Sequence, residues 1–412
     1  MSVLDRLPAR LVERAAELDA ADPLAAYRSE FVDAEGLVCY LDGNSLGRPL
    51  AVTAGHVADF VGDAWGSRLI RSWDEQWMDA PTELGDLIGR VALGAAAGQS
   101  VVADSTTVML YKLARAAVDA RPGRGEIVAD TANFPTDRYV LQSVAAERGL
   151  TIRWIEPDPV LGVTEEQVRA AVGERTALVL LSHIDYRSAY VADLPAITAA
   201  AHAAGALILW DLCHSAGVLE IDLDRHDVDL AVGCTYKYLN GGPGSPAFGY
   251  VAGRLHDELR QPITGWMGAD EPFAMETADY RAASGIRRFI SGTPPIVGML
   301  PLRDMLAVVE RAGLPAIRAK SVALTGLAIE IADEVLVGLG AAVASPRDAA
   351  VRGGHVLVTH PAARGATEEL WRRGVIPDFR PPSGLRLGLS PLSTGFTELA
   401  AGMAHIAEVL SK

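Results

Sequence analysis

The sequence contains little cysteine. Its three cysteines, Cys39, Cys213 and Cys234, form no CxxC pair, which excludes a disulfide framework and favours a reducing, cytoplasmic setting. The first residues, MSVLDRLPARLVERAAELDAADP, lack the apolar core of a secretory signal. Apolar stretches are broken by His, Gly or charge before they reach the ~18 residues that a membrane span needs. We therefore expect neither a secreted nor a membrane protein.

Positive charge is also scarce. Lys and Arg total 37 against 52 Asp and Glu, which gives a net charge of −15. Nucleic acids and anionic membranes are polyanions, so this balance argues against both as general partners, although it allows a local cationic pocket. At 412 residues the chain is too long for one compact core, so we expect a large domain and a smaller one.

Strand-like and helical runs alternate through the first part of the chain. The strand-like runs are SVVAD, GEIVAD, LTIRWIE, TALVLLSH, GALILWD, VDLAVGC and PAFGYVAG, and helical runs lie at 81–96, 106–119, 135–148, 164–173 and 193–204. This order is typical of βαβ units around a mainly parallel sheet, which binds ligands at the carboxyl ends of its strands. We predict an α/β fold with a mainly parallel, seven-stranded sheet.

The pattern changes after Pro294 and Pro295. Two long helical stretches, 297–312 and 315–337, lead to HVLVTH, a further helix, LRLGLS and a terminal helix. This order indicates a second, smaller α/β domain. The predicted boundaries are an N-terminal segment over 1–48 that packs on the small domain, a large domain over 49–300, and a small C-terminal domain over 301–412.

An acid and an amine follow two consecutive strands. Asp211 ends ILWD, with His214 just after it, and VDLAVGC leads into Tyr236 and Lys237. Pyridoxal phosphate (PLP) needs such a pair, because a carboxylate keeps its ring nitrogen protonated and an amine forms the Schiff base and moves the α-proton. A structural ion pair is the alternative. The flanking His and Tyr and the following NGGPGS favour the cofactor.

A cofactor phosphate also needs an anion site. DSTTVML follows a strand and opens a helix, so the free amides and the hydroxyls of Thr106 and Thr107 suit a phosphate. Simple capping by Ser105 or Thr106 explains the same pattern equally well.

Two further strand ends carry polar or aromatic side chains. In NFPTDRY, Phe134 suits stacking on the pyridine ring and Asp137 suits a bond near the ring hydroxyl or nitrogen. A capping turn with a core phenylalanine is the alternative. LSHIDYRS places Ser182 and His183 at another strand end, where we expect His183 to be structural.

Strings spread from about residue 40 to 392 resemble the kynureninases, which are PLP enzymes of fold type I, the aspartate-aminotransferase-like fold. They are YLDGNSLGRPL, IRSWDEQWMD, DLCHSAG, GCTYKYLNGGPGS, SGTPPI, RGGHVLVTHP and GVIPDFRPPSGLRLGLSPL. GCTYKYLNGGPGS and the NSLG turn are specific to this family, whereas DLxHSxG is shared with related PLP enzymes. The resemblance implies that a homodimer with a shared active site hydrolyses L-kynurenine to anthranilate and L-alanine in tryptophan degradation, with 3-hydroxykynurenine as a further candidate substrate.

The resemblance also assigns roles to residues. Lys237 carries the Schiff base, Asp211 pairs with the ring nitrogen, and Tyr236 acts as a general acid or base. The other implied cofactor contacts are Thr106, Thr107, Phe134, Asp137, Ser182, His214, Trp266 and Thr293, with Trp266 and Thr293 reaching over from the neighbouring subunit. Arg386 is the implied clamp for the substrate carboxylate, and Asn44 and Ser45 are further substrate contacts. No metal site is predicted.

Other PLP enzymes of the same fold are the nearest alternatives. A cysteine desulfurase or selenocysteine lyase needs a nucleophilic cysteine in the C-terminal half, and the sequence has no cysteine after Cys234. An aminotransferase would not require the kynureninase-like strings. A catalytically silent PLP-binding regulator is disfavoured, because lysine, aspartate, tyrosine and arginine are all retained together.

Overall fold

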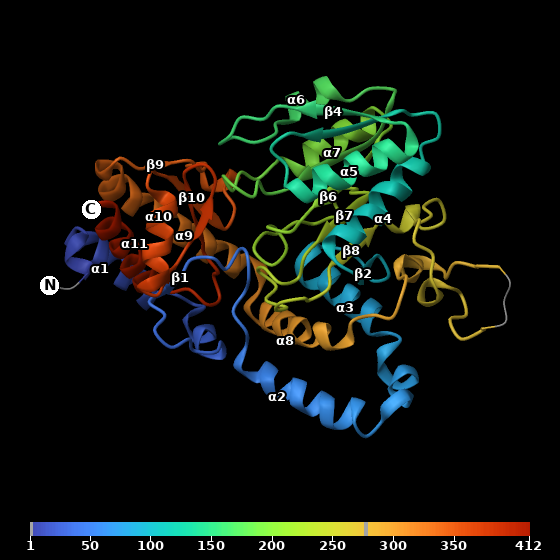
Figure 1. Cartoon of the computed structure of the whole chain (residues 1–412), viewed down its shortest axis with the longest axis horizontal. Helices are drawn as coiled ribbons and strands as arrows, with labels where there is room; N and C mark the ends of the chain where they lie inside the picture. The colour runs from blue at the N-terminus through green and yellow to red at the C-terminus, as the bar shows by residue number, and fades with distance from the viewer. Residues whose placement is uncertain (1–2, 276–278) are drawn as a thin grey trace.

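The computed structural model describes residues 3–275 and 279–412. A seven-stranded sheet forms the centre of its larger part (Figure 1). In spatial order the strands are β2 (Ser100–Val102), β8 (Phe248–Val251), β7 (Leu230–Gly233), β6 (Leu207–Asp211), β5 (Thr176–Ser182), β3 (Glu126–Asp130) and β4 (Thr151–Ile155). Only the pairings of β8, with β2 and with β7, are antiparallel within this sheet. The predicted mainly parallel, seven-stranded sheet is confirmed.

Burial on both faces explains why these strands read as continuous apolar runs. Every residue of β3, β6, β7 and β8 is buried, as expected when helices cover both faces of a sheet. The helices that follow the strands are α4 (Thr106–Asp119), α5 (Pro135–Arg148), α6 (Glu165–Ala171) and α7 (Leu194–Ala203). Because β5, β6 and β7 are parallel neighbours, their carboxyl ends meet at one edge of the sheet.

The smaller part is built on an antiparallel sheet of four strands with its own hydrophobic core. Its strands, in spatial order, are β12 (Asp378–Arg380), β13 (Gly384–Gly388), β10 (His355–Thr359) and β9 (Ala342–Val343), and its helices are α9 (Leu314–Ile331), α10 (Ala363–Arg372) and α11 (Phe396–Leu410). The N-terminal helix α1 (Ala9–Ala20) packs against α11, and β1 (Cys39–Tyr40) pairs with β11 (Val375–Ile376). The exact domain boundaries stay a prediction.

Three further helices lie below the central sheet in Figure 1, one of them along the lower edge of the picture. They are α2 (Ala51–Phe60), α3 (Ala80–Ile88) and α8 (Ile296–Ala312), and α8 contacts both of the others. The helix predicted over 81–96 was too long, since α3 is followed by one wider turn that ends at Gly94, where the backbone is left-handed with φ of 62°. Among the described residues, no helix has both the length and the apolar composition of a membrane span.

Candidate active site

A cavity of about 240 Å³ lies between the two parts, at the carboxyl ends of β5 and β6. It is lined by Ser45, Thr106, Thr107, Phe134, Thr136, Asp137, Ser182, Tyr186, Asp211, Cys213, His214, Tyr236, Lys237, Arg380 and Arg386. We call the side formed by residues 106–237 the strand-end wall. We call the opposite side the arginine wall, which consists of Arg380, Arg386 and the polar residues that contact them, Ser45, Asp42 and Asp378.

Lys237 lies in the strand-end wall, next to an imidazole and an aromatic ring. Its Nζ is 3.4 Å from Nε2 of His214 and 5.9 Å from the centre of the Phe134 ring. Burial, together with the positive charge of Lys237, lowers the pKa of His214 well below its usual value. A neutral His214 can therefore accept a hydrogen bond from the lysine amine.

Two buried carboxyl groups, Asp137 and Asp211, lie side by side in the same wall. Asp211 ends β6, and its Oδ1 accepts the amide hydrogen of Cys213 at 2.7 Å. Burial and the neighbouring Asp211 carboxylate raise the pKa of Asp137 well above its usual value. Burial therefore disfavours the charged form of Asp137, and its Oδ2 has no hydrogen-bond partner within the described residues.

The N-terminus of α4 is part of the strand-end wall and lines the cavity. Ser105 caps the helix, because its Oγ accepts the amide hydrogen of Val108 at 3.4 Å. The first amides of a helix have no acceptor inside it, and Thr106 and Thr107, which carry the first two, both line the cavity. This arrangement is suited to an anion.

The arginine wall is centred on Arg386, whose side chain is only 1% exposed. Its Nη1 donates to the carbonyl of Tyr186 at 2.7 Å, and its Nη2 donates to Oγ of Ser45 at 2.6 Å. One oxygen of Asp378 lies 2.7 Å from Arg386 and 2.6 Å from Arg380, so this carboxylate bridges the two arginines.

A second carboxyl group, Asp42, lies 3.7 Å from Arg386. Burial is the main cause that raises the pKa of Asp42 to about 6, and the negative charge of Asp378 acts in the same direction. The arginine wall therefore holds carboxyl groups of the protein itself beside the guanidinium that was predicted to bind the substrate.

Three predicted site residues do not line the cavity of their own chain. Asn44 is fully buried behind Ser45 and packs on Gly388, where an added Cβ would lie 1.9 Å from its Oδ1. Its predicted contact with substrate stays a prediction, whereas Ser45 of the same NSLG turn lines the cavity. Trp266 lines a separate cavity, and Thr293 is exposed. Their predicted contacts with a neighbouring subunit stay predictions.

Sequence reasoning also missed residues of the site. Tyr186 lines the cavity, and its ring packs edge-on against Phe134 with 5.3 Å between ring centres. Its position within SHIDYRS, just after a strand end, was the available signal. Asp378 carried no signal, because its role depends on its pairing with Arg386 across β12 and β13. His183 packs on Trp210, and burial lowers its pKa to about 4, in keeping with the structural role predicted for it.

The fold and the site define a protein of the class-V aminotransferase type. The family model described as Aminotransferase class-V matches residues 90–346. A cysteine desulfurase from Thermococcus onnurineus NA1 has a TM-score of 0.79 at 18% identity over 96% of this chain and 98% of its own. The cystine C–S lyase C-DES, solved with cysteine persulfide, also has a TM-score of 0.79 at 18% identity, over 90% of this chain and 97% of its own. At such low identity these structures establish the fold alone.

Closer sequence relatives define the family within that class. The chain is 40% identical to the kynureninase of Pseudomonas fluorescens over 96% of this chain and 94% of the relative. It is 39% identical to the kynureninase of Burkholderia pseudomallei strain K96243 over 97% of this chain and 95% of the relative. The family model of the kynureninase C-terminal domain matches residues 317–406. The chain belongs to the kynureninase family.

Proposed function

We propose that this chain uses PLP to hydrolyse L-kynurenine to anthranilate and L-alanine, in tryptophan degradation. The observation that carries the proposal is one cavity, in a chain of the kynureninase family, that joins an amine, a buried acid pair and a buried arginine. The amine and the acids suit the cofactor. The arginine suits the carboxylate of an amino-acid substrate.

The residues of the strand-end wall fit PLP. Lys237 would hold the aldehyde carbon, Asp211 would pair with the ring nitrogen, and Phe134, which is 36% exposed, offers a ring face for stacking. The free Oδ2 of Asp137 would take a polar group of the ring. Thr106, Thr107 and the first α4 amides would hold the phosphate, with Ser182, His214 and Tyr236 at the margin. When bound, PLP supplies an electron sink for a carbanion beside the substrate nitrogen.

The residues of the chain then have separate tasks. Lys237 takes the α-proton, and the neutral His214 beside it accepts a hydrogen bond from the lysine amine. Burial raises the pKa of Tyr236, so its phenol stays protonated and can donate a proton to Cβ of the substrate, once water has added to the γ-carbonyl carbon and the Cβ–Cγ bond has broken to release anthranilate. Arg386 orients the substrate carboxylate, because its planar fork suits that anion, and Ser45 fixes the fork through its hydroxyl.

Cysteine desulfurase activity is the alternative that shares this fold. Such enzymes need a reactive cysteine near the substrate. All three cysteines of this chain are buried, and only Cys213 lines the cavity, within the strand-end wall. A product assay with L-kynurenine and with L-cysteine as substrates separates the two activities.

The test is product identification with the purified, PLP-loaded protein. We expect anthranilate and alanine in equal amounts from L-kynurenine, and no alanine from L-cysteine. Formation of alanine from cysteine, or of a keto acid from kynurenine with no anthranilate, would overturn the proposal.

We further propose that the enzyme is a cytoplasmic homodimer with shared active sites. Trp266 and Thr293 support this, because both are accessible and outside the cavity of their own chain. Mixing a Lys237→Ala variant with a Trp266→Ala variant should restore part of the activity, since one hybrid site would be intact. Failure of the mixture to regain activity, with dimers present by ultracentrifugation, would contradict shared sites.

We also propose that the enzyme prefers L-kynurenine to 3-hydroxykynurenine. The side chain of Thr293, which is proposed to reach the cofactor phosphate of the neighbouring subunit, is shorter than that of an Asn, whose amide could bond the extra hydroxyl. A site without that bond gains little from the hydroxyl but still has to desolvate it. We expect a higher kcat/KM for L-kynurenine. Equal values, or the reverse order, would count against this preference.

A further inference from the structure

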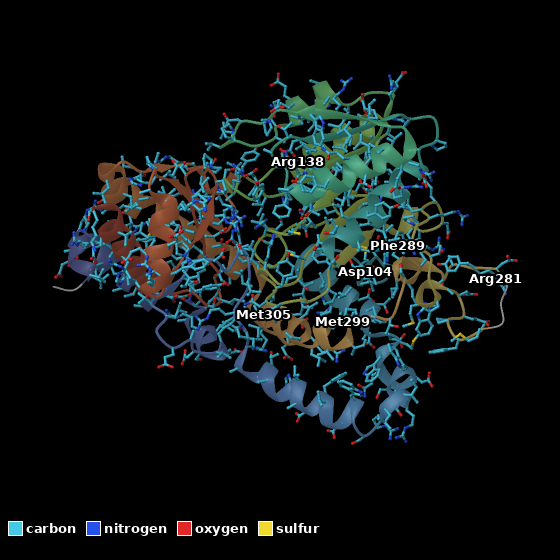
Figure 2. All side chains as sticks on the ribbon, in the orientation of Figure 1. Asp104, Arg138, Arg281, Phe289, Met299 and Met305 are labelled. Atoms are coloured by element: carbon cyan, nitrogen blue, oxygen red, sulfur yellow. The ribbon has the colours of Figure 1, made fainter. Side chains whose placement is uncertain are left out.

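Lys112 is a fully buried lysine in the middle of α4, the helix whose first residues line the cavity. Its Nζ lies 2.5 Å from Oδ2 of Asp104 and donates to the carbonyl of Phe289 at 2.9 Å. Helical side chains point toward the N-terminus of their helix, which is how Lys112 reaches back to the residue that precedes Ser105. Its ammonium therefore joins α4 to the loop before it and to the segment before α8. Figure 2 labels Asp104 and Phe289 on these two segments.

Asp104 has a backbone conformation that few residues other than glycine adopt. Its φ is 54°, in the left-handed region, which is uncommon for residues with a Cβ and is tolerated best by Asn and Asp. Its carbonyl accepts the amide hydrogen of Ala247 at 3.0 Å. This turn directly precedes Ser105, which caps α4, and Thr106 and Thr107, which line the cavity. The Lys112 ion pair holds the side chain of the residue that makes this turn.

We propose that Lys112 is a positioning residue for the cofactor phosphate, and that it fixes the cradle formed by residues 105–107 through Asp104. Lys112 does not itself line the cavity. It therefore acts on the phosphate through the backbone geometry of the cradle. The inference rests on the proposed function, in which this cradle binds the phosphate of PLP.

The test compares two ligands that differ only in the phosphate, pyridoxamine 5′-phosphate and pyridoxamine. Neither carries an aldehyde, so neither forms a covalent bond with Lys237. Binding to the full-length apoprotein is measured by equilibrium dialysis, and the thermal midpoint of each variant is recorded alongside. The wild-type ratio of the two dissociation constants is the contribution of the phosphate.

Lys112→Met and Asp104→Asn are the test variants. Asn tolerates the left-handed backbone, so Asp104→Asn removes the charge and keeps the turn. We expect both variants to lose affinity for pyridoxamine 5′-phosphate by about 10- to 100-fold, the range for loss of one hydrogen bond to a charged group. Their affinity for pyridoxamine should stay within about twofold of the wild-type value.

Lys320→Met is the matched control. Lys320 is also buried and paired, with its Nζ 2.7 Å from Asp22, but it belongs to α9 and lies outside the cavity. This variant should lose stability and keep the wild-type ratio of the two dissociation constants.

Two results would overturn the inference. The first is an unchanged affinity of Asp104→Asn for pyridoxamine 5′-phosphate. If Lys112→Met does not fold, Asp104→Asn alone tests the inference. An equal loss for both ligands would show a structural role only. The proposed function fails in a different way, namely if the wild-type protein binds both ligands equally well.

Discussion

The two walls of the cavity both contain acids and bases, but in different proportion: two carboxyl groups to one lysine in the strand-end wall, and two carboxyl groups to two arginines in the arginine wall. In the strand-end wall, Asp137 and Asp211 lie in the same cavity as a single lysine, Lys237, and burial together with Asp211 raises the pKa of Asp137. In the arginine wall, Arg380 and Arg386 share Asp378, with Asp42 close by. The strand-end wall is therefore short of positive charge, whereas the arginine wall already satisfies its cations. This difference suits a strand-end wall that binds the protonated pyridine ring of PLP. It also suits an arginine wall in which the substrate carboxylate takes the place of a carboxylate of the protein.

The largest expected effect lies in the strand-end wall. Lys237→Ala should lower kcat by roughly 10²- to 10⁴-fold, because the group that moves the α-proton is lost. The absorbance band of the Schiff base between PLP and Lys237, which we expect in the wild-type protein, should be absent from the variant. If the band of the variant were unchanged, a different lysine would hold the cofactor.

The next effect separates the two acids of that wall. Asp211→Asn should lower kcat by about 10- to 1000-fold, which corresponds to the 1–3 pKa units that a paired charge contributes to the ring nitrogen. Asp137→Asn should lower kcat less, because burial and Asp211 raise the pKa of Asp137 and so disfavour the charge that this substitution removes. Steady-state kinetics of the two variants tests this, and the reverse order of effects would exchange the two assignments.

A smaller effect is expected in the arginine wall. Arg386→Lys should raise KM for L-kynurenine by about 10- to 100-fold, since an ammonium cannot replace the planar fork. Arg380→Lys is the matched variant and should raise KM less, because Arg380 lies at the rim and is 27% exposed. A larger effect at Arg380 would move the carboxylate clamp to that residue.

The smallest effect is a pH dependence from Asp42. Its pKa in the folded protein is about 6, above the usual value, so the carboxyl is neutral below that pH and becomes charged above it. The charged form competes with the substrate for Arg386, and KM should therefore rise by about two- to fivefold between pH 5 and pH 7. Asp42→Asn should remove this rise. A rise that persists in the variant would assign the titration to another group.

The strand-end wall could be predicted from sequence because its geometry follows from local rules. Asp211 and Lys237 each follow an apolar strand, and the carboxyl ends of parallel strands meet at one edge. The arginine wall could not be predicted in the same way. Arg386 was assigned through family resemblance, and its partners, Asp378 and the Tyr186 carbonyl, depend on a strand pairing and on a loop from the other part of the chain.

Lys112 and Asn44 show two other limits of sequence reasoning. A lysine within a helix usually faces solvent, so nothing in the local pattern indicated that Lys112 is buried against Asp104. The NSLG turn indicated that the turn matters, but not which of its side chains enters the cavity. That choice is made by Gly388, whose missing side chain leaves the space that Asn44 fills.

The position of the cavity on the seam between two hydrophobic cores has a consequence for enzyme engineering. The groups proposed to carry out the chemistry belong to one core, and the arginines proposed to select the substrate belong to a short hairpin, residues 378–388, of the other. Libraries confined to that hairpin would change the substrate range without disturbing the strand ends. Libraries that vary only the residues at the strand ends would change the reaction that PLP carries out on the same amino-acid substrate.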